Sequence, residues 1–264
     1  MTKLSLLEAK DISKRFGGVQ ALTDVSFTIN HGEIYGLIGP NGAGKTSLFN
    51  VLTGIYEPDG GSFIFDGEPL DRVKPNEVAE RGIARTFQNI RLFQNLSALE
   101  NVMIGRHVRT KATVFGAILR DKATLAEEAA IEKRAYELLE YVGIAKRAND
   151  LAKHLAYGDQ RRLEIARALA TEPKLLALDE PAAGMNATET QALKRLLDDI
   201  RRDGTTILLI EHDMKLVMSV CARVLVLDYG RKIAEGTCAV VQNDPQVIAA
   251  YLGGEVSLNL KGTQ

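Results

Sequence analysis

The sequence predicts an α/β fold in which parallel strands alternate with helices and a helical block is inserted. Two unbroken apolar runs, 175–178 and 207–210, end at charged residues, which is typical of buried parallel strands. The stretch 34–52 passes from an apolar run through a glycine-rich loop into a helical pattern. From about residue 90 the chain is mainly helical in pattern, so this block interrupts the α/β core rather than following it.

The N-terminal part is expected to be largely β-structure. Three short β-rich runs, 6–16, 21–30 and 33–39, are separated by glycine-containing turn signals, and we expect them to form strands of one mixed sheet. The stretch 56–70 indicates a turn followed by a strand, and 75–83 begins a short helix. No internal repeat and no low-complexity segment is found in the sequence.

The later segments follow helical and strand patterns in turn. Periodic Leu, Ala and Glu predict helices within 97–121 and 125–144. A further helix is expected over 188–204, with Thr188 as its N-cap and Gly204 as its terminator. The segment 223–237 is typical of a closing β-hairpin.

Composition is that of an ordinary globular protein, with 264 residues, 45% hydrophobic and 25% charged residues. The formal net charge of -1 gives no global basic field, so we expect no nucleic-acid partner. No apolar run approaches the roughly 18 residues of a membrane span, and the start lacks a signal-peptide pattern, so a cytoplasmic location is expected. Cys221 and Cys238 lie in unrelated sequence contexts and are expected to be free thiols in a reducing compartment.

A phosphate-binding loop is the most specific motif. The stretch from Gly39 to Thr46 fits G-x-x-x-x-G-K-[ST] between a strand pattern and a helix pattern. Its backbone N–H groups and the positive end of the helix favour anionic oxygens. Lys45 can reach the β- and γ-phosphates, and the Thr46 hydroxyl can bind Mg²⁺. The residues expected to bind ATP here are Gly39, Pro40, Asn41, Gly42, Ala43, Gly44, Lys45, Thr46 and Ser47.

Two strand ends carry groups suited to phosphate hydrolysis. Asp179 and Glu180 follow the apolar run 175–178, and two adjacent carboxylates can serve separately as metal ligand and as water-polarising base. The alternative is a solvated acidic turn, which the apolar run disfavours. His212 follows the run 207–210; it is either structural or a hydrogen-bond donor to the γ-phosphate, and we favour the second.

These motifs together resemble the ATP-binding subunit of ABC transporters over essentially the whole chain. The motifs in that family's order are the Walker A stretch 39–46, "TFQ" ending at Gln88, "LAYGDQ" at 155–160, the Walker B stretch 175–180 and His212. The resemblance implies a P-loop NTPase (RecA-like) α/β core with an antiparallel β subdomain and an inserted α-helical subdomain. It implies one ABC ATPase domain over 5–253, with the helical subdomain at about 90–160, and a C-terminal tail at 254–264.

The resemblance also implies roles for individual residues. Phe16 falls where the family stacks an aromatic ring on adenine, and Glu180 and His212 match the general base and the switch histidine. Gln88 matches the Q-loop glutamine near Mg²⁺ and the attacking water. The implied catalytic residues are Glu180, His212, Gln88 and Lys45; the implied ligands of Mg²⁺ are Thr46, Gln88 and Asp179; and the signature loop acting on the partner's ATP is Ala156, Tyr157 and Gly158.

Several residues depart from the family's pattern. Phe16 stands where Tyr is commoner, and Asn186 stands where the D-loop usually ends in Asp. Ala156 replaces the signature serine, so the signature loop is expected to act mainly through backbone amides and the helix dipole. Asp159 replaces the signature glutamine and places a negative charge near an anionic ligand. Arg161 and Arg162 follow directly and could screen this charge. The alternative is that Asp159 is an acidic residue at the start of a helix that points to solvent.

The stretches "FGGVQAL" at 16–22 and "EPAAGMN" at 180–186, with the long segment 105–125, are similar to the branched-chain amino acid uptake group, the LivG type. Subunits for urea or short-chain amide uptake, and more distantly for lipopolysaccharide export, are the alternatives. The amphipathic pattern at 105–122 favours packing in the helical subdomain or against a membrane subunit over a membrane-surface helix.

The resemblance implies an ATP-hydrolysing motor with ATP and Mg²⁺ as its ligands. Its implied partners are a second ABC ATPase subunit, identical or different, integral membrane permease subunits and, indirectly, a solute-binding protein. The chain would then lie on the cytoplasmic face of the membrane through the permease. A non-transport ABC ATPase and a small-molecule P-loop kinase are the other function classes; the first usually has long coiled coils or tandem units, and the second leaves the signature loop and His212 unexplained.

Overall fold

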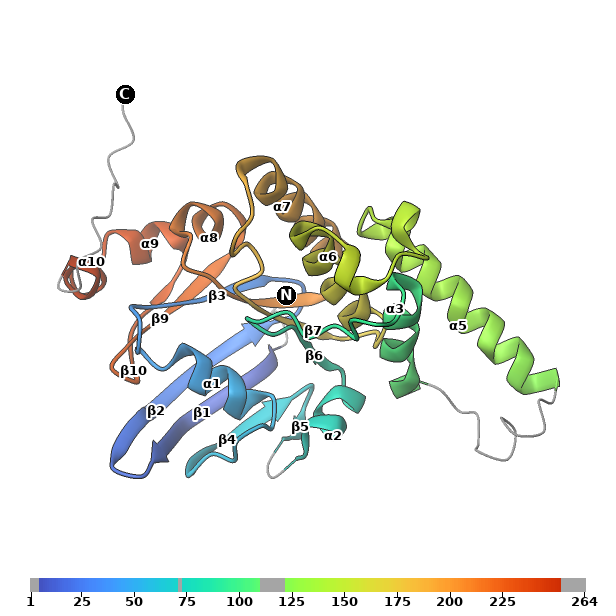
Figure 1. The fold of residues 1–264 in the computed structure, drawn as a ribbon. Coiled ribbons are helices and arrows are strands. Elements are labelled where there is room, and N and C mark those ends of the chain that lie inside the picture. Colours follow the sequence, from blue (N-terminus) through green and yellow to red (C-terminus); the bar gives the residue numbers. More distant parts are fainter. Residues whose placement is uncertain (1–4, 71–72, 110–121, 253–264) are drawn as a thin grey trace. The chain divides into compact units, whose positions relative to one another are not determined.

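The computed structural model describes residues 5–70, 73–109 and 122–252, and Figure 1 shows its helices and strands. The chain divides into two compact units, one comprising residues 1–75 and 197–264 and the other residues 76–196. The predicted segments 105–125 and 254–264 fall partly or wholly outside the described residues. Among the described residues, no helix is both long enough and apolar enough to cross a membrane.

The first unit contains an antiparallel sheet in the order β2-β1-β4-β5. Its strands are β1 (Ser5–Phe16), β2 (Val19–Asn30), β4 (Gly60–Phe65) and β5 (Glu68–Pro69). β1 pairs with β2 on one side and with β4 on the other. Alternate residues such as Leu7 and Ala9 are buried, as expected of strands with one face on a core.

The expectation of one mixed sheet for the first three strands was wrong. β3 (Ile34–Ile38) belongs to a different sheet, where it lies parallel to both β8 (Thr206–Ile210) and β9 (Arg223–Asp228). β10 (Arg231–Gly236) pairs antiparallel with β9 and closes the hairpin that the sequence predicted. β3 finds partners more than 160 residues away, and a local pattern carries no information on such pairing.

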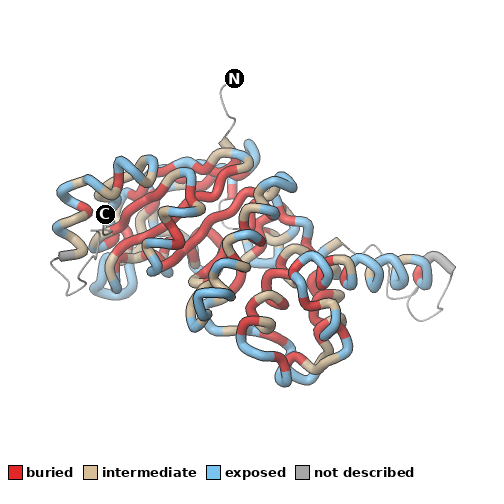
Figure 2. Tube along the Cα trace, turned by 90° about the horizontal axis from the view of Figure 1, so that it is seen from above, coloured by how far each residue is buried: buried red, intermediate tan, exposed pale blue. Residues whose placement is uncertain are grey.

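The helices of the first unit include the one that follows the glycine loop. They are α1 (Lys45–Leu52), α8 (Met214–Val220), α9 (Cys238–Gln242) and α10 (Pro245–Leu252). β3 and β8 are buried at every residue, which matches their unbroken apolar sequences. Figure 2 shows buried residues concentrated along the strands, with exposed residues along the helices and turns.

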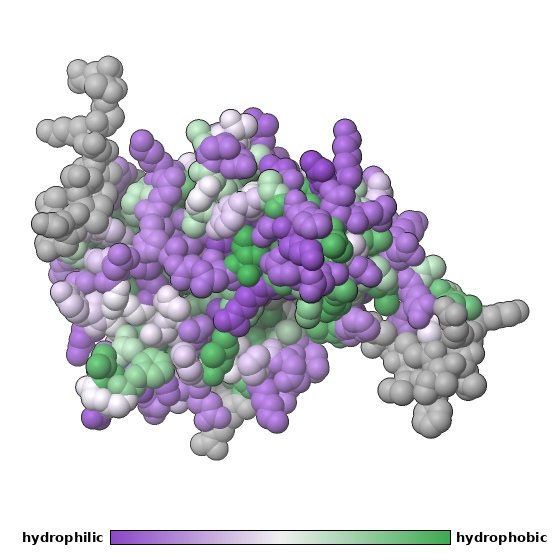
Figure 3. All heavy atoms as spheres, viewed as in Figure 1, coloured by the Kyte–Doolittle hydropathy of each residue, from purple (hydrophilic) through white to green (hydrophobic). Residues whose placement is uncertain are grey.

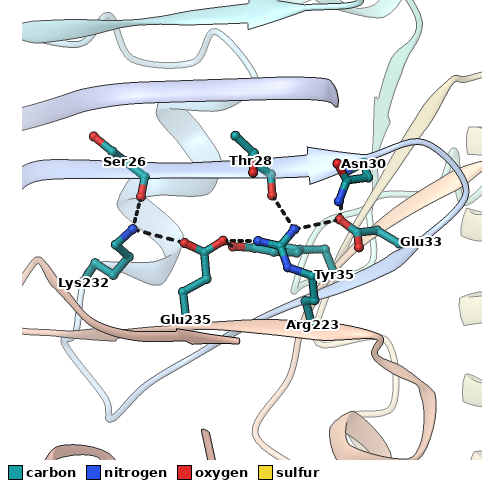
Figure 4. A network of polar contacts seen from close by, with 8 residues as sticks. All are labelled: Ser26, Thr28, Asn30, Glu33, Tyr35, Arg223, Lys232 and Glu235. Carbon is teal, nitrogen blue, oxygen red and sulfur yellow. Dashed lines mark hydrogen bonds and ion pairs between the residues drawn. The ribbon is translucent and has the colours of Figure 1, made fainter. Parts of the chain in front are cut away.

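A polar network joins both sheets of the first unit (Figure 4). The Arg223 guanidinium donates to the Thr28 carbonyl at 3.1 Å and pairs with the carboxylates of Glu33 at 3.3 Å and Glu235 at 2.6 Å. The Tyr35 hydroxyl also donates to Glu235, at 2.7 Å, and burial raises the pKa of this hydroxyl well above its usual range. Since Glu33 is only 3% exposed, the network compensates a buried charge.

The second unit combines two parallel strands with the helical block. β6 (Ile83–Arg85) pairs in parallel with β7 (Leu175–Asp179), and α2 (Pro75–Glu80) precedes β6. The block comprises α3 (Ala98–Arg106), α5 (Lys122–Tyr141), α6 (Tyr157–Leu169) and three short 3-10 turns. Ser97 and Glu100 form a capping box that begins α3. Residues 125–130 of α5 are exposed or half-buried.

The N-cap expected for α7 (Ala187–Arg202) was wrong by two residues. The Glu189 N–H donates to the Asn186 side chain at 3.0 Å, and the Asn186 N–H donates to the Glu189 carboxylate at 2.9 Å. Asn186 is therefore the cap, and Thr188 lies inside the first turn and is exposed. The helix ends just before Gly204, as predicted, and Gly204 has a φ of 98°.

Cys221 and Cys238 are both free thiols, as expected, but their surroundings are related. The Cys238 thiol donates to the Cys221 carbonyl at 3.3 Å, and burial raises the pKa of both thiols. Raised thiol pKa values favour the unreactive protonated form, so these residues are packing groups.

On the face shown in Figure 3, hydrophilic residues cover most of the surface of the described residues.

Candidate functional site

The glycine loop connects β3 to α1, as the motif predicted. Gly39 has a φ of 150°, and a Cβ there would lie 2.1 Å from the Leu227 carbonyl oxygen. Gly44 has a φ of 99°, and a Cβ there would lie 2.7 Å from the Ala21 carbonyl oxygen. Both positions therefore require glycine, and the loop is fixed against β9 and β2 rather than free to change shape.

The Lys45 side chain lies along the inside of this loop. Its ammonium donates to the carbonyls of Gly39 at 2.7 Å and Pro40 at 2.9 Å, and the residue is only 6% exposed. A backbone hydrogen bond of 3.0 Å from the Gly230 N–H to the Ala43 carbonyl further anchors the loop to the β9–β10 hairpin. The loop thus carries a buried positive charge at a helix N-terminus, which is the arrangement that binds phosphate.

The residues at the mouth of the loop are accessible. Asn41, Gly42 and Thr46 are exposed, and Pro40 and Ser47 are half-buried. The Thr46 hydroxyl is in the first turn of α1, where hard oxygen ligands for a cation are commonly placed. Ala43 is buried and contributes its backbone alone.

Phe16 lies at the end of β1 in the same unit and is 39% exposed. Its ring contacts Tyr56 edge-on, with centroids 5.0 Å apart, and Lys14 Nζ lies 5.6 Å from the ring centroid. An exposed ring held by a second aromatic offers a face for stacking on a flat base. Sequence reasoning did not find Tyr56, because nothing in the local pattern distinguishes it from a surface tyrosine.

His212 follows β8 and is exposed. Its backbone N–H donates to the carboxylate of Glu211 at 3.1 Å, and Asp213 caps α8 directly after it. The backbone at His212 is therefore held on both sides, and the residue lies just beyond the carboxyl end of a buried strand. That position is where ligands bind in open α/β sheets.

In the second unit, Asp179 is the last residue of β7 and Glu180 follows it, and the two have contrasting environments. Asp179 is 3% exposed, and its N–H donates to the Thr86 hydroxyl at 3.3 Å. Glu180 is half-buried and has a φ of 49°, an unfavourable backbone conformation for a residue with a side chain. Such strain is commonly stored where a side chain must be aimed at a particular point.

The structure brings Gln88 and Glu180 together. The Gln88 amide donates to Glu180 Oε2 at 3.0 Å, although 92 residues separate the two positions. A carboxylate has about four acceptor sites, so this bond orients Glu180 without using its full capacity. Phe87, beside Gln88, lies between the Arg85 and Arg91 guanidinium groups, each 4.4 Å from the ring centroid.

The signature stretch is the start of α6. Ala156 is the N-cap residue and makes no side-chain cap hydrogen bond, while Tyr157 and Gly158 form the first turn. Ala156 and Tyr157 are exposed and Gly158 is buried. The stretch is thus a helix N-terminus with a favourable dipole for an anion and no hydroxyl at the cap.

Arg161 does not screen Asp159, which corrects one sequence expectation. Arg161 is 3% exposed and pairs with Glu164, itself 2% exposed, at 3.1 Å. Its guanidinium also donates to the backbone carbonyls of Phe87 and Gln88. Sequence reasoning missed this role because a buried arginine is rare. The signal that could have found it is the Arg–Glu spacing of three residues within a helix.

Comparison with known proteins gives the same picture. The sequence pattern of the ABC transporter family matches residues 22–183, and that described as branched-chain amino acid ATP-binding cassette transporter matches residues 231–257. The chain is 45% identical to the high-affinity branched-chain amino acid transport ATP-binding protein LivG of Salmonella typhimurium, over 94% of this chain and 98% of the relative. It is 43% identical to BraF of Pseudomonas aeruginosa over the same shares.

More distant relatives and solved structures agree. The lipopolysaccharide export system ATP-binding protein LptB of Escherichia coli is 35% identical over 97% of this chain and 100% of its own length. Two crystal structures of ATP-binding cassettes of ABC transporters each match with a TM-score of 0.82. The nucleotide-free structure is 31% identical, and the match covers 94% of this chain and 99% of the matched chain. The structure in the ADP conformation is 32% identical, and the match covers 95% of this chain and 99% of the matched chain.

The predicted fold class is therefore confirmed: a P-loop NTPase core, an antiparallel β subdomain and a helical subdomain. The glycine loop is suited to phosphate, the family pattern matches most of the chain, and a pattern specific to one group matches near the C-terminus. The chain therefore belongs to the ABC transporter family, as an ATP-binding ATPase of the branched-chain amino acid group.

Proposed function

We propose that this ATPase drives the uptake of branched-chain amino acids through separate membrane permease subunits, working as a dimer with a second ATP-binding subunit. The observation that carries the solute assignment is the match of residues 231–257 to the branched-chain amino acid group, which lies outside the general ATPase motifs. The names of the LivG and BraF relatives support it. The chain would lie at the cytoplasmic face of the membrane, held there by the permease.

The first unit supplies most of the groups proposed to bind ATP. The Phe16 ring stacks on adenine, and the backbone N–H groups of residues 39–47 and the start of α1 bind the phosphates. Lys45 exchanges its two carbonyl partners for phosphate oxygens, which are stronger acceptors because they are charged. His212 donates a hydrogen bond to the γ-phosphate from the end of β8.

Mg²⁺ is proposed as the accompanying ion, and the chemistry of the candidate ligands fits it. Thr46, Gln88 and Asp179 offer a hydroxyl, an amide oxygen and a carboxylate, all hard oxygen ligands. The described residues contain no cluster of three or more His, Cys, Asp or Glu suited to a metal, and Mg²⁺ usually binds through few protein ligands plus substrate phosphates. When bound, the ion neutralises the charge that develops on the phosphates.

The second unit supplies the groups proposed for hydrolysis. Glu180 accepts a proton from the attacking water, and the Gln88 amide fixes the orientation of its carboxylate. The N-terminus of α6, with Ala156, Tyr157 and Gly158, binds the γ-phosphate of the ATP held by the partner subunit. Closure on ATP and opening after hydrolysis then move the attached permease.

The test is a vesicle assay with the chain and the membrane subunits that co-purify with it. We expect ATP hydrolysis to rise when leucine, isoleucine or valine is supplied with its solute-binding protein, and labelled leucine to enter the vesicles. Urea, acetamide and lipopolysaccharide serve as the competing solutes. Stimulation by one of these, with none by the branched-chain amino acids, would reject the solute assignment. Recovery of the chain without any membrane protein would reject the permease partnership.

A further inference from the structure

The first two turns of α6 hold the backbone of the segment 87–91, which we term the Q-loop. Arg161 donates through Nη1 to the Phe87 carbonyl at 2.8 Å and through Nη2 to the Gln88 carbonyl. From the next turn, the Glu164 carboxylate accepts the Arg91 backbone N–H at 2.8 Å. The Q-loop is thus bonded at both ends to one helix.

The same guanidinium is fixed by two further partners. It pairs with Glu164 Oε2 at 3.1 Å and donates to the Tyr157 hydroxyl through Nη2 at 3.0 Å and Nε at 3.2 Å. Tyr157 begins α6, and a Cβ placed on Gly184 would lie 3.1 Å from its ring. The loop after Glu180 therefore packs on the residue that holds Arg161 in place.

We propose that Arg161 is a positioning residue: it fixes the Q-loop to the signature helix, so that the Gln88 amide stays against Glu180. The inference rests on the proposed function, in which Glu180 is the base. This positioning role requires arginine, because a single planar guanidinium donates to two carbonyls, a carboxylate and a hydroxyl at once. A lysine ammonium keeps the charge but has three donors at a single point.

The consequence concerns movement. Since the Q-loop and the start of α6 are bonded together, a displacement of the signature helix carries the Q-loop backbone with it. The length and angle of the hydrogen bond between Gln88 and Glu180, the proposed base, then depend on the position of α6. Engagement of the signature stretch by a partner's ATP is thereby linked to the chain's own catalytic carboxylate.

Arg161→Lys tests the proposal, and Arg162→Lys is its matched control, because Arg162 is the next residue of the same helix and is only half-buried. Amide hydrogen exchange is measured over 87–91. The Arg91 N–H is the reporter, because its acceptor, the Glu164 carboxylate, is paired with Arg161. We expect Arg161→Lys to exchange there about tenfold faster or more than wild type, because the variant loses hydrogen bonds from a charged donor to the Phe87 and Gln88 carbonyls. Arg162→Lys should exchange like wild type.

Kinetics separate a positioning role from general damage. In Arg161→Lys we expect a lower kcat for ATP hydrolysis, with an unchanged affinity for ATP and an unchanged melting temperature. If that variant melts at a lower temperature, the double variant Arg161→Met with Glu164→Leu is used instead. It replaces both members of the buried pair by apolar residues, and such a replacement usually preserves folding. The double variant should show the same changes in exchange and in kcat. Wild-type exchange over 87–91 in a folded variant would overturn the inference.

The exchange comparison does not depend on turnover. A wild-type chain that fails to hydrolyse ATP contradicts the proposed function but leaves the exchange result to decide whether Arg161 holds the Q-loop. Conversely, if wild type hydrolyses ATP and Arg161→Lys and Arg162→Lys have the same kcat as wild type, the inference about Arg161 is overturned while the proposed function stands.

Discussion

Ala156→Ser adds a hydroxyl at the N-cap of α6, the position in the signature stretch from which a side chain can cap the helix. The backbone is already suited to a cap, with φ of -59° and ψ of 153°, and no side-chain cap bond is made. A serine oxygen there can accept the N–H of Asp159, three residues into the helix. N-cap serine in place of alanine is worth about 1 kcal/mol, so the melting temperature should rise by about 2–4 °C.

The same hydroxyl should change catalysis in the dimer. A serine that accepts one bond still has its O–H to donate, and a hydrogen bond to a charged phosphate is worth about 1.5–3 kcal/mol. We expect the ATP concentration for half-maximal turnover to fall by about tenfold or more, because the proposed arrangement places this hydroxyl at the partner's ATP. The affinity of the isolated subunit for ATP should not change, since its own glycine loop is untouched.

The assay combines thermal denaturation, phosphate release in the assembled dimer and titration of the monomer with a fluorescent ATP analogue. Ala187→Ser is the matched control: it is exposed at the start of α7, where Asn186 already supplies the cap. The control should leave all three readouts unchanged. A shifted monomer affinity in Ala156→Ser would refute the action on the partner's ATP, and an unshifted melting temperature would refute the capping argument.

Substitutions at three other residues test separate parts of the account. Lys45→Met, which keeps the stem and removes the charge, should weaken ATP-analogue binding at least about tenfold; unchanged binding would show that the ammonium does not contact the phosphates. Phe16→Ala should weaken the same binding several-fold and Phe16→Tyr should not, since a ring face suffices; equal affinities would exclude stacking. Arg223→Met leaves the buried Glu33 without its cation, so unfolding should be easier by about 3 kcal/mol; an unchanged melting curve would contradict this.

Local signals in the sequence predicted much of the structure. The apolar runs that became β7 and β8 are buried at every residue, because a strand covered on both faces needs no alternation. The glycine loop was equally readable, since Gly39 and Gly44 stand where a side chain would strike a carbonyl. In both cases the pattern that predicts the feature lies within a few consecutive residues.

Two of the errors depend instead on residues far away in the sequence. The pairing of β3 with β8 and β9 depends on residues more than 160 positions away. The burial of Arg161 depends on carbonyls 73 and 74 residues away. The cap of α7 was misassigned for a different reason: Asn186 and Thr188 are both good cap residues, and only the reciprocal bond with Glu189 separates them.

The most direct test of the central claim, that the chain is an ATPase with Glu180 as its base, is phosphate release by wild type and by Glu180→Gln. Glu137→Gln is the control, because Glu137 is a half-buried acid on α5 whose ion pair is with Arg134 of the same helix. Glu180→Gln should bind ATP normally, accumulate as a closed dimer seen by light scattering, and hydrolyse ATP about 10²–10⁴-fold more slowly. Glu137→Gln should match wild type. Hydrolysis by Glu180→Gln at the wild-type rate would contradict the account.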